Sequence, residues 1–309
     1  MSEKKPSIGG QAVMEGVMMN GEHHYTVAVR AQNKTIRTEI FDRKSVLDQH
    51  KYLNIPIVRG VIRFVESMII GFKTLDYSAD VYMEEEETQK KEAKTSLGKF
   101  WNKNGDSILS GLSMIFAVIL AVFLFVFLPV RLAKFVMMDL LNIPALLGLF
   151  EGLIRMGIFL LYIILISRIK DIRRTFEYHG AEHKTINCFE ADLPLTVENV
   201  RKMSRYNRRC GTSFLFLIMF INILIFSLIR ITDPFMRFVI HLAMVPVIAG
   251  LSYEVLKFSA RSKSKIIGAL VAPGIWIQHL TTKEPDDEEM EVAIASVKRL
   301  FEKEHPEFL

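Results

Sequence analysis

Residues 177–184, with the sequence EYHGAEHK, combine residue types that bind metal ions and activate water. His179 and His183 are four positions apart, so on a helix both imidazoles leave from the same face. A metal ion about 2.1 Å from each ring nitrogen can then be held by a single helical turn. Glu182 completes the pattern His-x-x-Glu-His, in which two histidines bind zinc and the glutamate activates a water molecule. A short pattern with three fixed positions also arises by chance, so it stands as a hypothesis for the rest of the chain to support.

Two different sets of additional ligands could complete this site. A distant glutamate, for which Glu254 is the candidate, would give an open site of the catalytic kind. The chain has only two cysteines, which offer no disulfide framework but would give a closed, structural site with two histidines. Both sets remain open at this point. The predicted metal ligands, with Zn²⁺ as the expected cofactor, are His179, His183, and either Glu254 or Cys188 and Cys210; the predicted catalytic residue is Glu182.

Two further stretches could contact anions. Arg205, Arg208 and Arg209 precede Cys210 and could meet lipid phosphate or another anionic partner, although such arginines also commonly hold the inner end of a membrane span. Residues 9–21 are rich in glycine, but they lack the Lys-Ser/Thr of a P-loop and do not match the dinucleotide fingerprint. We therefore expect residues 9–21 to form a packed loop rather than a phosphate site.

Composition places these residues in a membrane protein. Half of the 309 residues are hydrophobic while 24% are charged, which excludes a disordered chain and a small disulfide scaffold. Four apolar segments have about the 18 or more residues needed to cross a bilayer. These segments are 107–129, 146–167, 214–231 and 238–258. Within the second, Glu151 and Arg155 are four apart on one helix face, which indicates a buried polar contact or a functional cavity.

The distribution of lysine and arginine predicts the orientation of the chain in the membrane. Residues 1–106, 168–213 and 257–309 carry 16, 10 and 8 of these residues, whereas the loops 130–145 and 232–237 carry three together. Because cytoplasmic loops hold the excess of positive charge, we expect a multi-pass protein of the cytoplasmic (inner) membrane with both termini in the cytoplasm. The net charge of +5 then reflects topology, so no specific nucleic acid is expected as a partner.

The remaining segments predict a mainly α-helical protein with small soluble elements. Residues 25–31 and 35–41 predict a β-hairpin, and 55–72 an amphipathic helix on or beside the membrane. Residues 266–280 contain Pro-Gly, which favours an interfacial or re-entrant segment, and Asp286 with Glu289 predicts the cap of a final helix. The segments expected along the chain are 1–54 (Gly-rich loop and hairpin), 55–106 (amphipathic helix and charged linker), 107–167 (two membrane helices), 168–213 (cytoplasmic loop with the histidine motif and both cysteines), 214–258 (two more membrane helices) and 259–309 (interfacial segment and cytoplasmic helix).

Four motifs in order resemble a known group of proteins. GGQAVMEGVMM, HGAEHKTINCFE, RCGTSF and LTTKEPDDEEMEVAI together resemble an uncharacterised bacterial inner-membrane family described as predicted metal-dependent enzymes. The similarity covers residues 9–300. It implies a polytopic membrane protein with a metal site at His179, Glu182 and His183, and it supplies no substrate.

The function expected from these observations is that of a zinc-dependent membrane hydrolase. Its substrate would be a peptide bond and its site would lie at the cytoplasmic membrane face, with Glu182 polarising the water. The alternative is a non-enzymatic factor that assembles or inserts membrane proteins and carries a structural metal or a His/Cys cluster. The lipid bilayer is the expected partner in both cases, with other membrane proteins as further partners. A channel is less favoured because the four spans show no inverted repeat.

Overall fold

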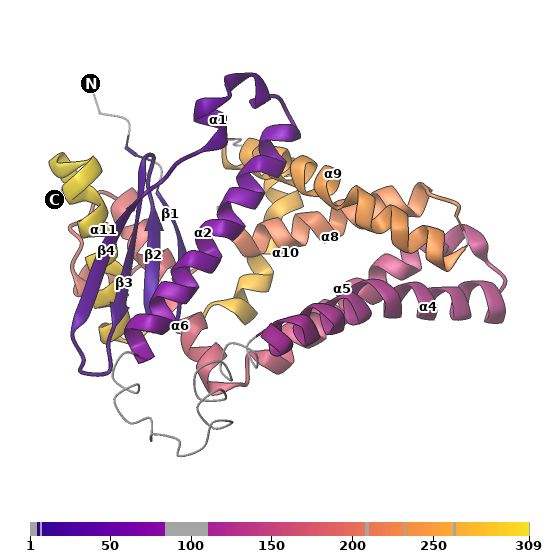
Figure 1. Cartoon of the computed structure of the whole chain (residues 1–309), viewed down its shortest axis with the longest axis horizontal. Coiled ribbons are helices and arrows are strands. Elements are labelled where there is room, and N and C mark those ends of the chain that lie inside the picture. Colours follow the sequence, from indigo (N-terminus) through magenta and orange to yellow (C-terminus); the bar gives the residue numbers. More distant parts are fainter. Residues whose placement is uncertain are drawn as a thin grey trace, which may run out of the picture. The chain divides into compact units, whose positions relative to one another are not determined.

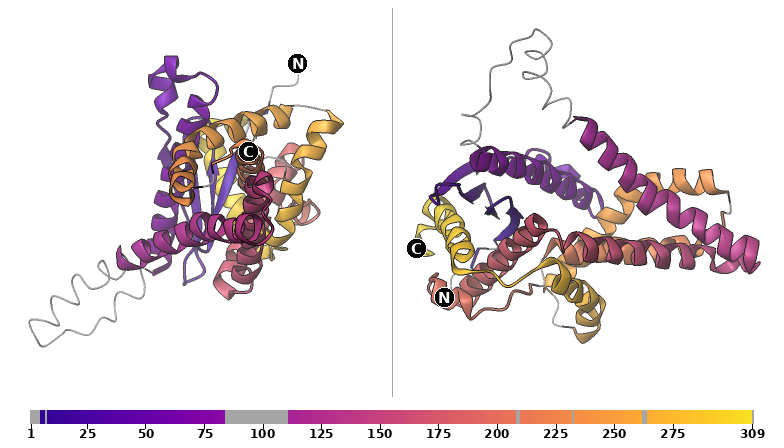
Figure 2. Two further views of the ribbon diagram at one scale, coloured as in Figure 1. Left: turned by 90° about the vertical axis from the view of Figure 1, so that its right-hand side faces the viewer. Right: turned by 90° about the horizontal axis from the view of Figure 1, so that it is seen from below.

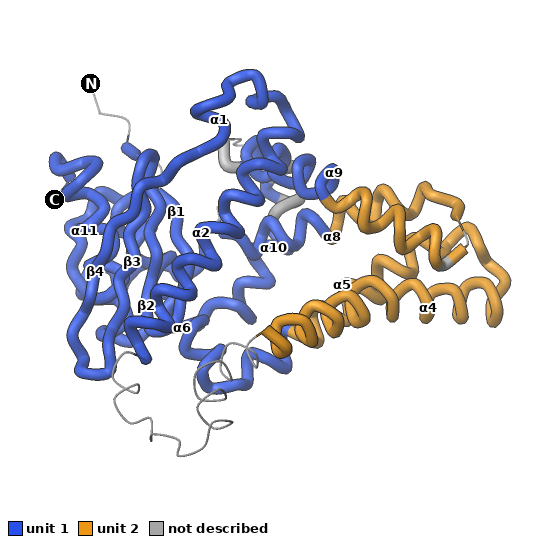
Figure 3. Tube along the Cα trace, viewed as in Figure 1, with its two compact units in different colours: residues 1–84, 163–218, 246–309 blue, residues 85–162, 219–245 orange. Residues whose placement is uncertain are grey.

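A computed structural model describes residues 5, 6, 8–83, 111–207, 210–231, 233–261 and 264–308. The described part is mainly helical with a small N-terminal antiparallel sheet, as predicted (Figure 1). The charged linker predicted after residue 83 lies outside the described residues. The chain forms two compact units (Figure 3): unit 1 contains residues 1–84, 163–218 and 246–309, and unit 2 contains 85–162 and 219–245.

The sheet of unit 1 is a four-stranded antiparallel meander in the order β1-β2-β3-β4. Its strands are β1 (Gly9–Val13), β2 (Gly16–Asn20), β3 (His24–Arg30) and β4 (Ile36–Asp42). The second hairpin, β3 with β4, confirms the one predicted from the sequence. The packed loop expected over residues 9–21 was wrong, because these residues form the first hairpin, β1 with β2. Val13 pairs with Gly16 across a two-residue turn in which Glu15 has a φ of 48°.

Helices cover both faces of this sheet (Figures 1 and 2). Because strand side chains alternate, Val17, Met19 and Ala28 face one way, into a core shared with α6 (Lys170–Glu190) and α11 (Asp287–Glu304). Met18 of β2 and Val27 of β3, which alternate with these residues along the strands, face the other way, toward α2 (Val58–Met83). The sheet therefore lies between α2 on one side and the α6–α11 pair on the other.

Both helices predicted outside the membrane spans are present, although the first, expected over 55–72, covers 58–83. The amphipathic helix α2 begins after Pro56 and Ile57, whose φ of 70° cannot continue a helix, and it runs to Met83. At the start of α11, Asp286 and Glu289 form a complete capping box. The stripe predicted for this helix, from Met290 to Phe301, is buried against the sheet and α6.

In the described part of the chain, four helices are long and apolar enough to cross a membrane, as predicted. Their bounds are Gly111–Leu140, Pro144–Ile166, Gly211–Leu228 and Phe235–Ser259. Several shorter elements make up these spans: η3 (Phe123–Phe127), α4 (Leu128–Lys134) and η4 (Phe135–Leu140) lie in the first, η5 (Pro144–Leu146) and α5 (Leu147–Ile166) form the second, α8 (Gly211–Leu228) is the third, and α9 (Pro234–Arg261) contains the fourth. The remaining helical elements with described bounds are α1 (Val46–Gln49), η1 (Lys51–Leu53), α7 (Val197–Arg201), α10 (Lys265–Thr281) and η6 (Pro306–Phe308). Residues 266–280 thus belong to one helix, α10, which continues through Pro273 and is not among the four candidate spans.

Unit 2 contains a buried polar cluster within its candidate spans. The Glu151 carboxylate in α5 accepts hydrogen bonds from Arg155 and from Arg237 of α9, each at 2.7 Å, and it also pairs with His241. Arg155 donates in addition to the Phe125 carbonyl oxygen at 2.8 Å. Phe125 lies in the π-helical turn η3, where the wider winding can leave a carbonyl free for such a contact. The predicted contact between Glu151 and Arg155 is therefore confirmed, and the side chains of Arg237 and His241 join it.

Candidate metal centre

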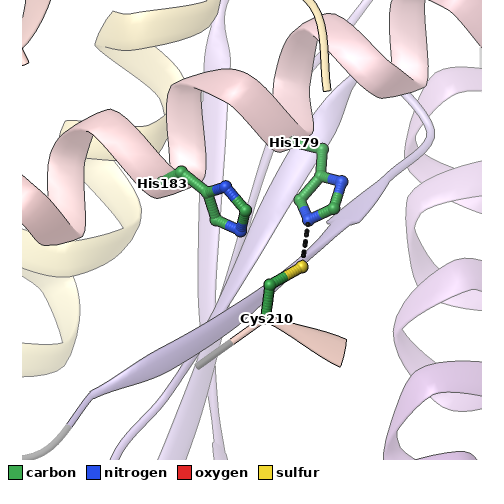
Figure 4. Close-up of side chains that lie close together, drawn as sticks. All are labelled: His179, His183 and Cys210. Atoms are coloured by element: carbon green, nitrogen blue, oxygen red, sulfur yellow. Dashed lines mark hydrogen bonds between the residues drawn. The ribbon is translucent and has the colours of Figure 1, made fainter. Parts of the chain in front are cut away.

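His179 and His183 lie one turn apart on α6 and point into the same space (Figure 4). Their ring centroids are 4.4 Å apart. The helix is held tightly at this turn because the backbone of Lys283 crosses it at Gly180, where a Cβ would collide with the Lys283 carbonyl oxygen. Lys283 also donates its backbone N–H to the Phe176 carbonyl oxygen at 2.8 Å. The segment after α10 therefore fixes the part of α6 that carries both histidines.

Backbone carbonyl groups determine which nitrogen of each imidazole is free. His179 Nδ1 lies 2.9 Å from the Thr281 carbonyl oxygen, and His183 Nδ1 lies 2.6 Å from that of Arg205. A carbonyl oxygen only accepts, so each Nδ1 carries the proton and each Nε2 keeps its lone pair. The same arrangement orients metal-binding histidines, whose second nitrogen is held by a carbonyl or carboxylate.

Cys210 supplies the third donor of the cluster. Its Sγ lies 3.2 Å from His179 Nε2, and the donor atoms of Cys210, His179 and His183 all lie within 4.8 Å of one another. Zinc–nitrogen and zinc–sulfur bonds of about 2.1 and 2.3 Å put neighbouring donors of a tetrahedral site about 3.5 Å apart, so small side-chain rotations suffice to hold one ion. Cys210 precedes the first residue of α8, and the Thr212 N–H donates to its sulfur at 3.4 Å.

Gln278 fixes the loop that presents Cys210. This fully buried side chain of α10 forms a reciprocal pair with the backbone of Asn207: it accepts from the Asn207 N–H at 3.0 Å and donates to the Asn207 carbonyl at 2.7 Å. Its amide also lies 3.2 Å from Ser213 Oγ, on the far side of the cysteine. One helix, α10, therefore positions the cysteine loop through Gln278 and His179 through Thr281.

Glu182 lies beside the two histidines, with little exposure to solvent. Its Oε2 is 3.8 Å from His179 Nε2 and 3.9 Å from His183 Nε2. Burial raises the pKa of the Glu182 carboxyl to about 7, and the nearby His179 opposes this shift in part. The β1 backbone packs against the same side chain, because a Cβ on Gly10 would lie 2.6 Å from Glu182 Cγ.

The three donors and Glu182 open into one small cavity of about 40 Å³. Such a volume exceeds the roughly 15 Å³ that one water molecule requires. The cavity is lined by Ile8, Gly9, Gly10, His179, Glu182, His183, Ile186, Asn207, Cys210 and Gly211. The chemistry of the donors and the space beside them fit a divalent metal ion with room for a small ligand.

Other predicted site residues lie elsewhere. Glu254 forms an ion pair with Arg59 of α2, with 2.6 Å between Arg59 Nε and Glu254 Oε1. Cys188 is buried in the core, where its Sγ lies 3.6 Å from the Pro194 carbonyl oxygen. Arg205 contributes its carbonyl to His183, while its guanidinium lies over the Tyr206 ring. Arg208 and Arg209 lie outside the described residues.

Sequence reasoning missed Thr281, Gln278 and the two glycines of β1 as parts of the site. The glycine pair was visible in the sequence, but nothing local connects it to the histidines 170 residues later. Thr281 acts through its backbone carbonyl, and the Gln278 side chain pairs with the backbone of Asn207, 71 residues away, so no local pattern pointed to either residue.

The fold and the site define a helical protein with four candidate membrane spans and a sheet-containing unit that carries a His₂Cys cluster. Residues 55–303 match the family described as "Protein of unknown function (DUF1385)", and the chain belongs to this family. The chain is 37% identical over 311 residues to "Uncharacterized protein YqhQ" of Bacillus subtilis (strain 168), an alignment that covers 97% of this chain and 95% of that protein. No solved structure matches the chain.

Proposed function

We propose that this protein is a metal-dependent hydrolase of the cytoplasmic membrane that uses zinc and acts on peptide bonds. The observation that carries the proposal is the convergence of His179 Nε2, His183 Nε2 and Cys210 Sγ on a cavity that also contains Glu182. Catalytic zinc sites keep three protein ligands and leave the fourth position for water or substrate, whereas structural sites use four protein ligands.

Each residue then has a separate task. The two histidines and Cys210 would hold the ion, and nitrogen and sulfur donors are those that zinc prefers. A zinc ion held there would supply a Lewis acid for a water molecule or a substrate carbonyl. Glu182 accepts a proton from the attacking water and returns it to the leaving amine. The water oxygen bonds to the carbonyl carbon as the carbon–nitrogen bond breaks, so one water molecule is divided between the new carboxyl and amino groups.

The position of the site in the chain supports membrane-proximal action. Cys210 directly precedes the candidate span α8, and α6 begins four residues after the candidate span α5 ends. The excess of lysine and arginine in 168–213 over the segments 130–145 and 232–237 favours the cytoplasmic side. We propose accordingly a multi-pass protein of the inner membrane with both termini in the cytoplasm.

A closed structural site, as the assembly-factor alternative would use, has less support. Such a site needs a fourth protein ligand, and Cys188 lies in the core against the carbonyls of Leu193 and Pro194. Glu254 is paired with Arg59. The three-donor arrangement therefore favours catalysis.

The test is Glu182→Gln, which keeps the shape of the side chain but removes the base. The variant should retain its metal while losing about 10²- to 10⁴-fold in hydrolysis, the usual contribution of a general base. Hydrolysis is measured as new N-termini in the membrane proteome of a host lacking the protein, after expression of each variant, by N-terminal mass spectrometry. Glu177→Gln, on the same helix and paired with Arg173, is the matched control and should behave as the wild type. Unchanged cleavage by Glu182→Gln at equal protein level would contradict the proposal.

A further inference from the structure

The strand β1 is an edge of the sheet, and it borders the candidate metal centre. The strand order places β2 on one side of β1 and leaves the other side without a strand partner. Gly9 and Gly10 of this strand are exposed, and both line the cavity that contains Glu182 and the metal-binding side chains. An edge strand offers a row of backbone donors and acceptors to an added strand.

The hydrogen-bond pattern of the sheet shows which backbone groups face the open side. In antiparallel sheets each residue bonds to one neighbouring strand and the next residue bonds to the other. The Arg30 N–H donates to the Glu15 carbonyl, so Glu15 bonds toward β3. The next residue, Gly16, therefore bonds toward β1, where its partner is Val13.

Continuing this alternation along β1 places Gln11 in a bonded pair with Met18 of β2. Gly10 and Ala12 then direct their N–H and C=O groups away from β2. Among the described residues, no hydrogen bond reaches these outward groups. Gly10 and Ala12 therefore present two N–H and two C=O groups with the spacing that a neighbouring β-strand requires.

The glycines of β1 bring this edge close to the candidate catalytic residue. The Gly10 backbone lies against the Glu182 side chain, where any Cβ would collide with it. Gly9, the residue before it, lines the same cavity. A chain that pairs with Gly10 and Ala12 would therefore run past Glu182 and the cavity.

We propose that β1 binds an extended polypeptide segment as an added strand and so leads its backbone across the metal centre. This inference rests on the proposed hydrolase function and adds its substrate class: an unfolded or extended polypeptide, recognised through its main chain. Only an extended peptide repeats N–H and C=O groups with the spacing that Gly10 and Ala12 offer, and binding by strand addition uses these groups for affinity.

The test removes one outward donor while leaving the fold in place. Ala12→Pro deletes an N–H that faces the open edge, a position where sheets tolerate proline. Thr38→Pro is the matched control, because Ala31 bonds to Thr35 and the alternation then turns the N–H of Thr38, on the opposite edge strand β4, to the outside. Both substitutions are made in full-length, metal-loaded protein that also carries Glu182→Gln, so that bound polypeptide is not cleaved. Metal content and the unfolding temperature verify that each variant is folded.

The probe is fluorescently labelled, reduced and carboxymethylated lactalbumin, an unfolded polypeptide, with fluorescence anisotropy as the readout. Ala12→Pro should weaken binding about tenfold or more, the effect of losing a hydrogen bond together with the pairing around it, and Thr38→Pro should leave binding unchanged. Equal affinity of Ala12→Pro and its parent, or no binding by any variant, would overturn the inference. Because affinity is measured without cleavage, these results do not depend on whether the wild type is a hydrolase.

A second measurement keeps the inference testable if Ala12→Pro does not fold. The protein with Glu182→Gln alone is offered a synthetic peptide of alternating alanine and threonine, or the same peptide N-methylated at alternate residues. Strand addition predicts that only the unmethylated peptide competes with the labelled polypeptide, and equal competition by both contradicts it. A dimer that Ala12→Pro dissociates would show that the edge pairs with a second copy instead.

Discussion

Among the described residues, two buried polar clusters differ in how completely their members satisfy one another. In unit 2, the single carboxylate of Glu151 is shared by Arg155, Arg237 and His241, and none of these side chains has a buried unpaired atom among the described residues. In unit 1, backbone carbonyls hold the Nδ1 atoms of His179 and His183, and the N-terminus of α8 holds Cys210. The Nε2 atoms and the Cys210 sulfur converge beside a cavity, with one hydrogen bond between Cys210 and His179.

This difference teaches how to separate a structural cluster from a binding site. A saturated network in an apolar environment holds helices together, because each polar group would otherwise be left without a partner. Donors that are fixed in position and converge on one space, with only one hydrogen bond among them, are arranged to bind a ligand. The cluster of unit 1 is of this second kind.

Breaking the unit 2 cluster should have the largest effect on stability. Arg237→Met removes one cation and leaves the fully buried Glu151 with fewer partners, which should cost about 3–5 kcal/mol of unfolding free energy. The measurement is denaturant or thermal unfolding of the full chain in detergent. Arg131→Met, at an exposed position, is the control and should change stability by less than about 0.5 kcal/mol. Equal stability of the two variants would mean that the cluster does not hold unit 2 together.

Replacing each cysteine in turn should distinguish a metal ligand from a residue that only packs in the core. Cys210→Ser removes a donor and should lower metal affinity by at least about a hundredfold, beyond what loss of a supporting contact causes. Cys188→Ser should retain its metal because the thiol of Cys188 lies in the core against backbone carbonyls. Metal content after dialysis against a graded chelator measures both. Loss of metal from Cys188→Ser would show that the site is a closed one.

A smaller effect is expected from the residue that positions the cysteine loop. Gln278→Met removes the reciprocal pair with Asn207 and should reduce metal affinity about 10- to 100-fold, the range for residues that orient metal ligands. Trp276→Leu, two positions earlier and exposed, should leave the affinity unchanged. If the two variants bind metal equally well, α10 does not position the site.

The predictable parts of the fold are those encoded by local pattern. The four spans follow from their apolar length, and the cap of α11 follows from Asp286 and Glu289 three residues apart. The first hairpin was missed because its turn, Met14-Glu15, lacks the Asn-Gly or Asp-Gly that marks two-residue hairpins, while the glycines lie in the strands. The sequence therefore predicted the elements whose apolar runs, caps or turns follow common local patterns, and it missed the one whose turn does not.

Only the part of the candidate site that lies on a single helix, α6, could be predicted from the sequence. The spacing of His179 and His183 places them on one face of α6, as expected. The sequence left Glu254, Cys188 and Cys210 as equal candidates for further ligands, since all three depend on tertiary contacts. Similarly, Arg237 and His241 join Glu151 from a helix some 85 residues away, which no spacing rule could show.

The most direct test of the central claim is zinc-edge X-ray absorption on the full-length, zinc-loaded protein. We expect one zinc ion per chain, with a single sulfur neighbour at about 2.3 Å and nitrogen or oxygen neighbours at about 2.0–2.1 Å that include two imidazoles. Cys210→Ser should remove the sulfur signal and His183→Ala one imidazole. Two sulfur neighbours, or no bound zinc in the wild type, would contradict an open site built from His179, His183 and Cys210.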